Sequence, residues 1–165
     1  QELARLLADT DTEVLMKIGH THLLIELGSL RFVSKLIDGK FPDYRRAIPE
    51  IGELVITANR LVLREALARA AILVGDNRGV RLQLEKDLLQ IQAHNPEQEQ
   101  AEESIAVTYA HAELEMGFNV NYLIDALTHL STEQVNLFVS DQGGSCLIRA
   151  LDQQNCQYVV SPMTL

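Results

Sequence analysis

The sequence has few of the residues that several common protein classes require. Its 165 residues include only two cysteines, Cys146 and Cys156, which are too few for a disulfide framework and form no C-x-x-C pair for zinc or redox chemistry. No run approaches the roughly 18 consecutive apolar residues that cross a bilayer. The first residues, Q-E-L-A-R-L-L-A-D, lack the basic start and the cleavage site of a signal peptide. We therefore expect a cytoplasmic protein with two reduced thiols and no membrane partner.

Basic residues are nearly missing from the second half of the chain. Residues 1–86 hold 13 lysines and arginines against 12 acids, whereas residues 87–165 hold Arg149 alone against 11 acids, and the net charge is −9. Contacts to phosphate need clustered Lys and Arg, so nucleic acid cannot bind over the whole surface. Any contact with DNA must come from a localised face.

Patterns typical of catalysis are also missing. G-D-N-R-G at 75–79 lacks the G-K-[ST] of a phosphate loop, and D-Q-G-G-S-C at 141–146 lacks G-x-S-x-G. His20 and His22 have no further ligand at zinc spacing. The carboxylates of H-A-E-L-E at 111–115 carry no sign of the burial that acid catalysis requires. We therefore assign no catalytic residues, no metal and no cofactor.

Helical periodicity is present three times. Apolar residues recur at i, i+3 and i+4 in 2–8, strong helix formers fill 60–73, and 119–130 has an apolar stripe that begins after Asn119, a plausible N-cap. The starts of these segments repeat every 58 to 59 residues. The chain is therefore modular.

Each predicted helix is followed by three segments with strand-like alternation, and the second and third helices are each preceded by a short extended stretch, at 56–57 and 114–118. The repeated unit is β-α-β-β-β, which gives an α+β fold with antiparallel sheets. Two complete units, 53–165, should pair into one domain with both helices on one face of the sheet, and 1–41 would be half a unit. The nine predicted strands are 14–18, 22–27, 30–36, 80–84, 88–93, 104–109, 135–140, 145–150 and 156–160.

The connector F-P-D-Y-R-R-A-I-P, residues 41–49, holds the densest group of basic and aromatic residues. Pro42 and Pro49 remove backbone donors and favour extended geometry in their neighbours, so the segment should be neither helix nor strand. We expect a stiff linker whose side chains are held in place.

These features together resemble the bacterial sliding clamp, the beta subunit of DNA polymerase III. The resemblance covers essentially the whole chain and implies the DNA clamp fold: a head-to-tail dimeric ring with helices around duplex DNA and sheets outside. It assigns 1–50 to the second half of the middle domain plus the linker, and 51–165 to a complete C-terminal domain. The matching segments are S-K-L-I-D-G-K-F-P-D-Y-R-R (34–46), A-R-A-A-I-L (68–73), R-G-V-R-L (78–82), N-P-E-Q-E (95–99), A-E-E (101–103), G-F-N-V-N-Y (117–122) and Y-V-V-S-P-M-T-L (158–165).

The resemblance implies a hydrophobic pocket for short peptides from DNA polymerases and the clamp loader. An alternative is that Tyr122 and Val159 are core residues and Pro162 ends a strand. Ala47, Ser161 and Thr164 depart from the family pattern, so we expect this chain alone to bind such peptides weakly. The implied pocket residues are Pro42, Arg46, Asn119, Tyr122, Val159, Pro162, Met163 and Leu165.

The resemblance also implies DNA-facing arginines, Arg5, Arg60 and Arg64, which could equally be ordinary solvated helix residues. It implies a subunit interface with an apolar centre and an acidic fringe, although Ile72 and Leu73 could instead be core. The full-length protein would be a homodimer and this chain a monomer. The interface residues are Ile72, Leu73, Glu99, Glu102 and Glu103.

The leading hypothesis is a non-catalytic replication processivity factor. The DNA partner would be held topologically and without sequence preference. The rival hypothesis is a protein-only adaptor, in which the same pocket binds peptides and the arginines have no role with DNA.

Overall fold

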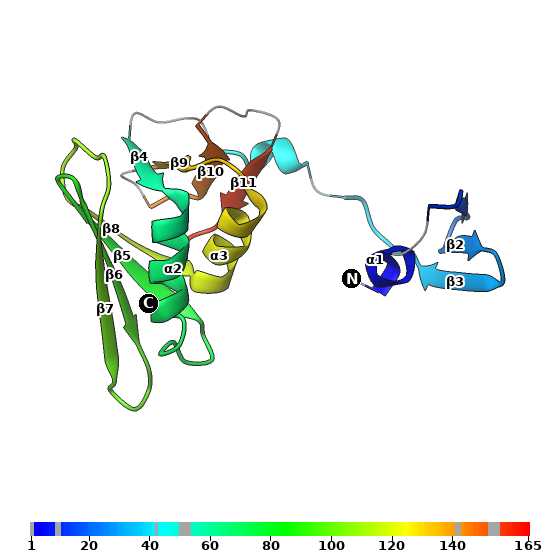
Figure 1. Ribbon diagram of the computed structural model, residues 1–165, viewed down its shortest axis with the longest axis horizontal. Helices are drawn as coiled ribbons and strands as arrows, with labels where there is room; N and C mark the ends of the chain where they lie inside the picture. The colour runs from blue at the N-terminus through cyan, green and yellow to red at the C-terminus, as the bar shows by residue number, and fades with distance from the viewer. Residues whose placement is uncertain (1, 9–10, 42, 50–53, 141–142, 152–155) are drawn as a thin grey trace. The chain divides into compact units, whose positions relative to one another are not determined.

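The computed structural model describes residues 2–8, 11–41, 43–49, 54–140, 143–151 and 156–165. The contacts divide the chain into two units, Gln1–Pro42 and Asp43–Leu165. These contacts group the linker after residue 42 with the second unit. Figure 1 shows the elements of both units.

The first unit is a helix and one three-stranded antiparallel sheet. It consists of α1 (Glu2–Leu7), β1 (Leu15–Ile18), β2 (His22–Leu27) and β3 (Leu30–Lys35), with the strand order β1-β2-β3. Gly28, with φ of +56°, makes the turn between β2 and β3. Among the described residues of this unit only Ile25 is a fully buried hydrophobic residue, and Met16 and Ile18 are exposed. The unit therefore has the elements of half a module without a core of its own.

The second unit is built from two copies of β-α-β-β-β, as the sequence predicts. The linker forms a short 3₁₀ helix, η1 (Tyr44–Arg46), so it is not wholly irregular. The first copy is β4 (Leu54–Asn59), α2 (Arg60–Ala70), β5 (Gly79–Glu85), β6 (Leu88–His94) and β7 (Gln100–Ala106); the second is β8 (Leu114–Asn119), α3 (Val120–His129), β9 (Gln134–Val139), β10 (Cys146–Ala150) and β11 (Gln157–Val160).

The two copies exchange their leading strands. The sheets have the orders β7-β6-β5-β8 and β11-β10-β9-β4, so β8 completes the sheet of the first copy and β4 that of the second. The first residue of each helix also bonds to the other copy. The N–H of Arg60 donates to Glu133 O, and the N–H of Val120 donates to Arg78 O, both at 2.9 Å. Neither copy can complete its sheet without the other.

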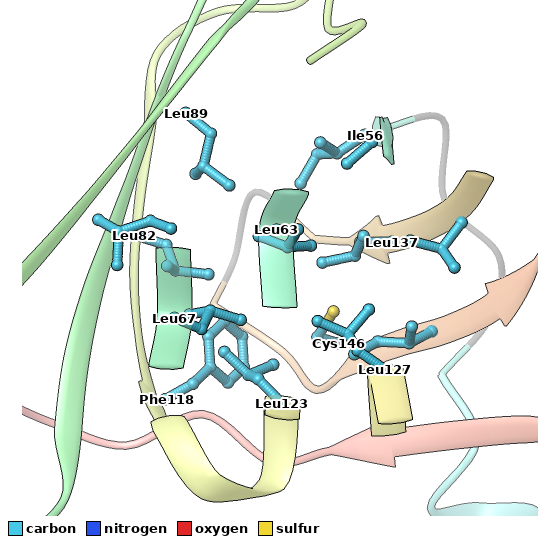
Figure 2. Close-up of a cluster of buried hydrophobic side chains, with 14 of the residues drawn as sticks. Ile56, Leu63, Leu67, Leu82, Leu89, Phe118, Leu123, Leu127, Leu137 and Cys146 are labelled. Carbon is cyan, nitrogen blue, oxygen red and sulfur yellow. The ribbon is translucent and has the colours of Figure 1, made fainter. Parts of the chain in front are cut away.

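The two helices present equivalent residues to one core. Asn59 and Asn119 cap α2 and α3 with their side-chain oxygens. Counted from these caps, the buried positions coincide in pairs: Leu63 with Leu123, Ala66 with Ala126, Leu67 with Leu127, and Ala70 with Leu130. Figure 2 shows leucines of both helices pointing into the cluster formed with Phe118 and the inner faces of the sheets.

The helices α2 and α3 pack against each other on the same side of the sheets, as the clamp hypothesis requires. The main error of the sequence prediction is at β7, which begins at Gln100 rather than at 104. The polar residues in the first half of β7 are tolerated because alternate side chains of a strand point to opposite faces of the sheet, and one of these faces is exposed here.

Candidate peptide groove, helical face and subunit edge

A groove with a volume of about 400 Å³ lies between the linker and β11. The carboxylate of Asp43 accepts a hydrogen bond of 3.2 Å from the N–H of Arg45, which starts η1 and holds this side of the groove. The lining residues are Tyr44, Ala47, Ile48, Gln157 and Val159. The described lining therefore contains no acidic or basic side chain.

The sheet beside the groove is apolar on the face that points away from the helices. In β10, Leu147 is paired with Val159 on one side and with Phe138 on the other. Leu147 and Phe138 are buried, yet neither belongs to the cluster around the helices, because their strand neighbours point that way instead. This second apolar surface therefore runs across the sheet from Val159, which lines the groove, to Leu147 and Phe138.

A positive charge lies on the same sheet face. The guanidinium carbon of Arg149 is 4.5 Å from the centroid of the Phe138 ring, a cation–π arrangement. Arg149 is paired with Gln157, which lines the groove. Since Arg149 is the only lysine or arginine after residue 86, this contact places the one permanently charged cation of the second half on the groove's sheet face.

Three of the predicted pocket residues, Val159, Pro162 and Asn119, are connected through the bridge between the end of the chain and β8. Val159 lines the groove, and three residues later Pro162 forms an isolated β-bridge with Phe118 of β8. Asn119 follows directly and its side chain accepts the N–H of Asn121 at 3.0 Å, so it serves as the cap of α3. Tyr122, in the first turn of α3, is 61% exposed, so it is not a core residue.

The remaining predicted pocket residues lie elsewhere. Arg46 is exposed, with its Nε 3.7 Å from a carboxylate oxygen of Asp43, and it does not line the groove. Pro42 lies outside the described residues. Met163 donates its N–H to Gly117 O at 2.9 Å. Leu165 lines a separate cavity of about 320 Å³, together with Asn77, Gly79, Arg81, Gln92 and His94.

Sequence reasoning missed Tyr44, Ile48, Gln157 and Phe138 with its partner Arg149. A signal for this second apolar face of the sheet was present, because V-N-L-F-V has three consecutive apolar residues where a strand with one wet face would alternate. Such a run indicates a strand that is covered on both faces.

The predicted DNA-facing arginines differ in their surroundings. Arg5 forms a two-point ion pair with Glu2, at 3.0 and 3.1 Å. Arg60 donates from Nε to Thr132 O at 2.7 Å and from Nη1 to Leu127 O at 3.1 Å. Within the described part of the chain, Arg64 has neither an ion-pair nor a hydrogen-bond partner. Arg64 is therefore the arginine of α2 whose charge is best placed for an external ligand.

The predicted subunit edge combines an exposed apolar residue with acids. Ile72 is 80% exposed, which excludes the alternative that it is core, and Leu73 is half-buried. Arg69 of α2 donates two hydrogen bonds, of 2.7 and 2.9 Å, to the carboxylate of Glu103 in β7, and this contact lowers the pKa of Glu103.

The other two acids of this edge, Glu99 and Glu102, are exposed. The carboxylate of Glu99 accepts a hydrogen bond of 2.6 Å from the amide of Asn95, which fixes it in the turn before β7. The acids thus lie on β7 and the turn before it, and the Arg69–Glu103 contact joins that strand to the helix that precedes Ile72.

The described residues contain no group of three or more His, Cys, Asp or Glu side chains that could hold a metal ion. None of the described helices has the length and apolar character needed to cross a membrane. The site thus consists of an apolar groove, a helical face with few free charges and an exposed apolar edge.

This combination defines a duplicated β-α-β-β-β scaffold that carries an apolar groove on the outer face of one sheet. Comparison with protein families matches residues 45–164 to the DNA polymerase III beta subunit, C-terminal domain, and residues 1–43 to its central domain. The chain belongs to the DNA polymerase III beta subunit family.

The relatives agree with this assignment. The chain is 49% identical to the beta sliding clamp of Pseudomonas aeruginosa and 44% identical to that of Escherichia coli K12, over 99% of this chain and 45% of each relative. It thus spans less than half the length of the curated relatives that it matches.

Solved structures show the same similarity. The structure of the Pseudomonas aeruginosa DNA polymerase III beta subunit is similar with a TM-score of 0.84 and 49% identity, over 99% of this chain and 45% of that chain. A sliding clamp from Bartonella birtlesii bound to griselimycin is similar with a TM-score of 0.86 and 35% identity, over the same shares. The clamp fold expected from the sequence is confirmed.

Proposed function

We propose that this chain is part of a sliding clamp that encircles duplex DNA and tethers DNA polymerases and the clamp loader. The observation that carries the proposal is an apolar groove between the linker and β11 in a chain of the beta subunit family. Extended peptides with apolar anchors fit such a groove, because burial of the anchors supplies affinity and the rim supplies orientation. Tethering involves no chemical reaction, so the protein would need no catalytic residues. It would act in the cytoplasm.

The charge distribution suits retention of DNA by topology. Residues 87–165 carry 11 acids against one arginine and no lysine, which repels phosphate over most of the surface. In the ring, α2 and α3 would face the DNA, with Arg64 as the free cation of α2. A few bases of this kind attract the duplex without fixing its register, so that the clamp slides.

The ring would close as a homodimer through the edge around Ile72. An 80% exposed isoleucine with acids around it has the apolar centre and charged rim of a subunit interface. The surface on the other subunit would come from the part of the protein that precedes this chain. The 165 residues alone would therefore stay monomeric.

The test uses the full-length protein and nicked circular DNA. After loading, the clamp should remain on the circle at high salt and slip off when the circle is cut to a linear molecule. Ordinary charge binding would be lost in high salt whether the DNA is circular or linear. A protein-only adaptor would bind peptides in the groove and never be retained on the circle, and that result would refute the proposal.

A further inference from the structure

The segment that follows β11 lies on a hollow made by two glycines. Gly79 in β5 and Gly117 in β8 sit diagonally across the paired strands, since Gly79 is paired with Asn119 and Gly117 with Arg81. Their neighbours Val80 and Phe118 are fully buried in the core around the helices. The two glycines therefore belong to the opposite, outer face of the sheet, where the absence of side chains leaves a hollow.

Residues of the 161–165 segment occupy this hollow. Pro162 forms a bridge with Phe118, and the N–H of Met163 donates to Gly117 O at 2.9 Å, so the segment extends the sheet along β8. Leu165 then lies over both glycines. A Cβ built on Gly117 would be 2.8 Å from Leu165 Cγ and would also collide with the carbonyl oxygen of Met163.

The two glycines differ in what a side chain would meet. At Gly79 the colliding atom is Cδ2 of Leu165, and the sulfur of Met163 would be at an ordinary distance of 3.6 Å. At Gly117 one colliding atom belongs to the backbone of the segment. Glycine in the interior of a strand is unfavourable, and it commonly marks a place where other chain atoms approach closely.

We propose that Gly79 and Gly117 form a seat for residues 161–165 and act as positioning residues for the peptide groove. Packing of Leu165 on the two glycines holds the 161–165 segment against β8. The held segment positions Pro162, which is three residues after Val159 of the groove. The part of the proposal that concerns peptides rests on the proposed function, whereas the seat itself does not.

The first test measures hydrogen exchange of the Met163 amide in the 165-residue chain by NMR. Gly117→Ala and Leu165→Ala should each speed exchange at Met163 by about tenfold or more, because the segment opens locally, while the Leu82 amide in the middle of β5 should keep its rate. Gly79→Ala should speed exchange less, because it displaces only the end of the flexible Leu165 side chain. Gly144→Ala is the matched control, since among the described residues its Cβ would meet Ser140 Cβ alone, at an ordinary distance of 3.5 Å.

The double variants sharpen this test. Without the leucine side chain, a methyl group at Gly79 has nothing to displace, so Gly79→Ala with Leu165→Ala should exchange no faster at Met163 than Leu165→Ala alone. At Gly117 the backbone of Met163 still collides, so Gly117→Ala with Leu165→Ala should exchange faster than Leu165→Ala alone. Additive effects at Gly79, or unchanged Met163 exchange in Gly117→Ala, would overturn the seat.

The second test titrates a fluorescent pentapeptide with apolar anchor side chains into the full-length protein. Gly117→Ala should weaken binding several-fold in proportion to the loss of Met163 protection, and Gly144→Ala should not. An opened segment with unchanged peptide affinity would overturn the positioning role. If the unmodified protein bound no such peptide, the proposed function would fail while the exchange experiment still decided the seat.

Discussion

The Nη1 atom of Arg60, the first residue of α2, donates a hydrogen bond of 3.1 Å to the carbonyl oxygen of Leu127 near the end of α3. The last carbonyls of a helix have no partner within it and carry its negative pole, so a guanidinium there satisfies them and is attracted electrostatically. A residue expected to face DNA thus joins the two helices of the module.

Replacement of Arg60 should therefore act on stability. Arg60→Gln removes charge-assisted bonds to Leu127 and Thr132, and we expect the free energy of unfolding to fall by about 1–3 kcal/mol. Arg64→Gln is the matched control, because Arg64 has no partner in the described chain and should change stability by less than about 0.5 kcal/mol. Urea denaturation measures both, and equal effects would contradict the structural role of Arg60.

Alanine occupies equivalent buried positions in the two helices that pack against each other. Ala66 and Ala126 are essentially inaccessible, and each lies between buried leucines of its helix. Ala126→Leu should therefore destabilise the protein by about 1–3 kcal/mol through overpacking. Ala68→Leu, at an exposed position of α2, should be nearly neutral. A stability of Ala126→Leu close to that of the unmodified chain would mean that the helix interface is loose.

The two thiols should differ in reactivity. Burial raises the pKa of Cys146 to about 12 from an ordinary value of 9.0, whereas Cys156 is exposed. At pH 8 a disulfide reagent such as DTNB should titrate one thiol in the folded chain and two in denaturant, because only a thiolate in contact with solvent reacts. Cys156→Ser should leave none that reacts in the folded chain.

The raised pKa also gives an alkaline dependence of stability. The unfolded chain ionises Cys146 from about pH 9 upward, while the folded chain keeps it protonated until about pH 12. The unfolded state therefore binds fewer protons in this window, and stability that is fully present below pH 9 is lost as the pH rises to 12. Cys146→Ala should show a smaller loss than the unmodified chain when both are unfolded in urea at pH 8 and pH 10.

The helices and most strands were predictable because their signals lie within short stretches of the sequence. Asn59 and Asn119 precede apolar residues at helical spacing, and the strands alternate between apolar and polar residues. The exchange of β4 and β8 was not predictable, because strand order depends on which edges meet after the chain has collapsed. Alternation within L-E-M-G-F contains no information about its partner strand.

The site was predictable only in part, for a similar reason. Val159 could be assigned to the groove by resemblance, but its neighbours Tyr44 and Ile48 depend on how the linker packs on β11. The hydrogen bonds of Arg60 end on backbone carbonyls more than 60 residues away, at Leu127 and Thr132. No spacing rule in a single sequence gives such contacts.

The exposed edge predicts the state of association. With Ile72 80% exposed, Ile72→Arg should leave the urea midpoint of the 165-residue chain unchanged within error, and light scattering should give the mass of a monomer for both. In the full-length protein the same change should convert dimer to monomer, since it places an unpaired charge at an apolar contact. Thr128→Arg, at an exposed position on α3, should leave the dimer intact. A stable dimer of the 165-residue chain would contradict this prediction.

The groove predicts opposite effects for two substitutions. Val159→Ala removes apolar area from one wall and should weaken binding of an apolar pentapeptide to the full-length protein, by about 0.5–1.5 kcal/mol. Ala47→Val adds apolar area to the facing wall and should strengthen binding by up to about 1 kcal/mol, because Ala47 is exposed and has room for a larger side chain. Fluorescence titration measures both, with Ala68→Val on the exposed surface of α2 as the control. If Ala47→Val weakened binding, the bound peptide would already fill the space beside Ala47. That result would contradict the prediction that the groove has room for a larger side chain there.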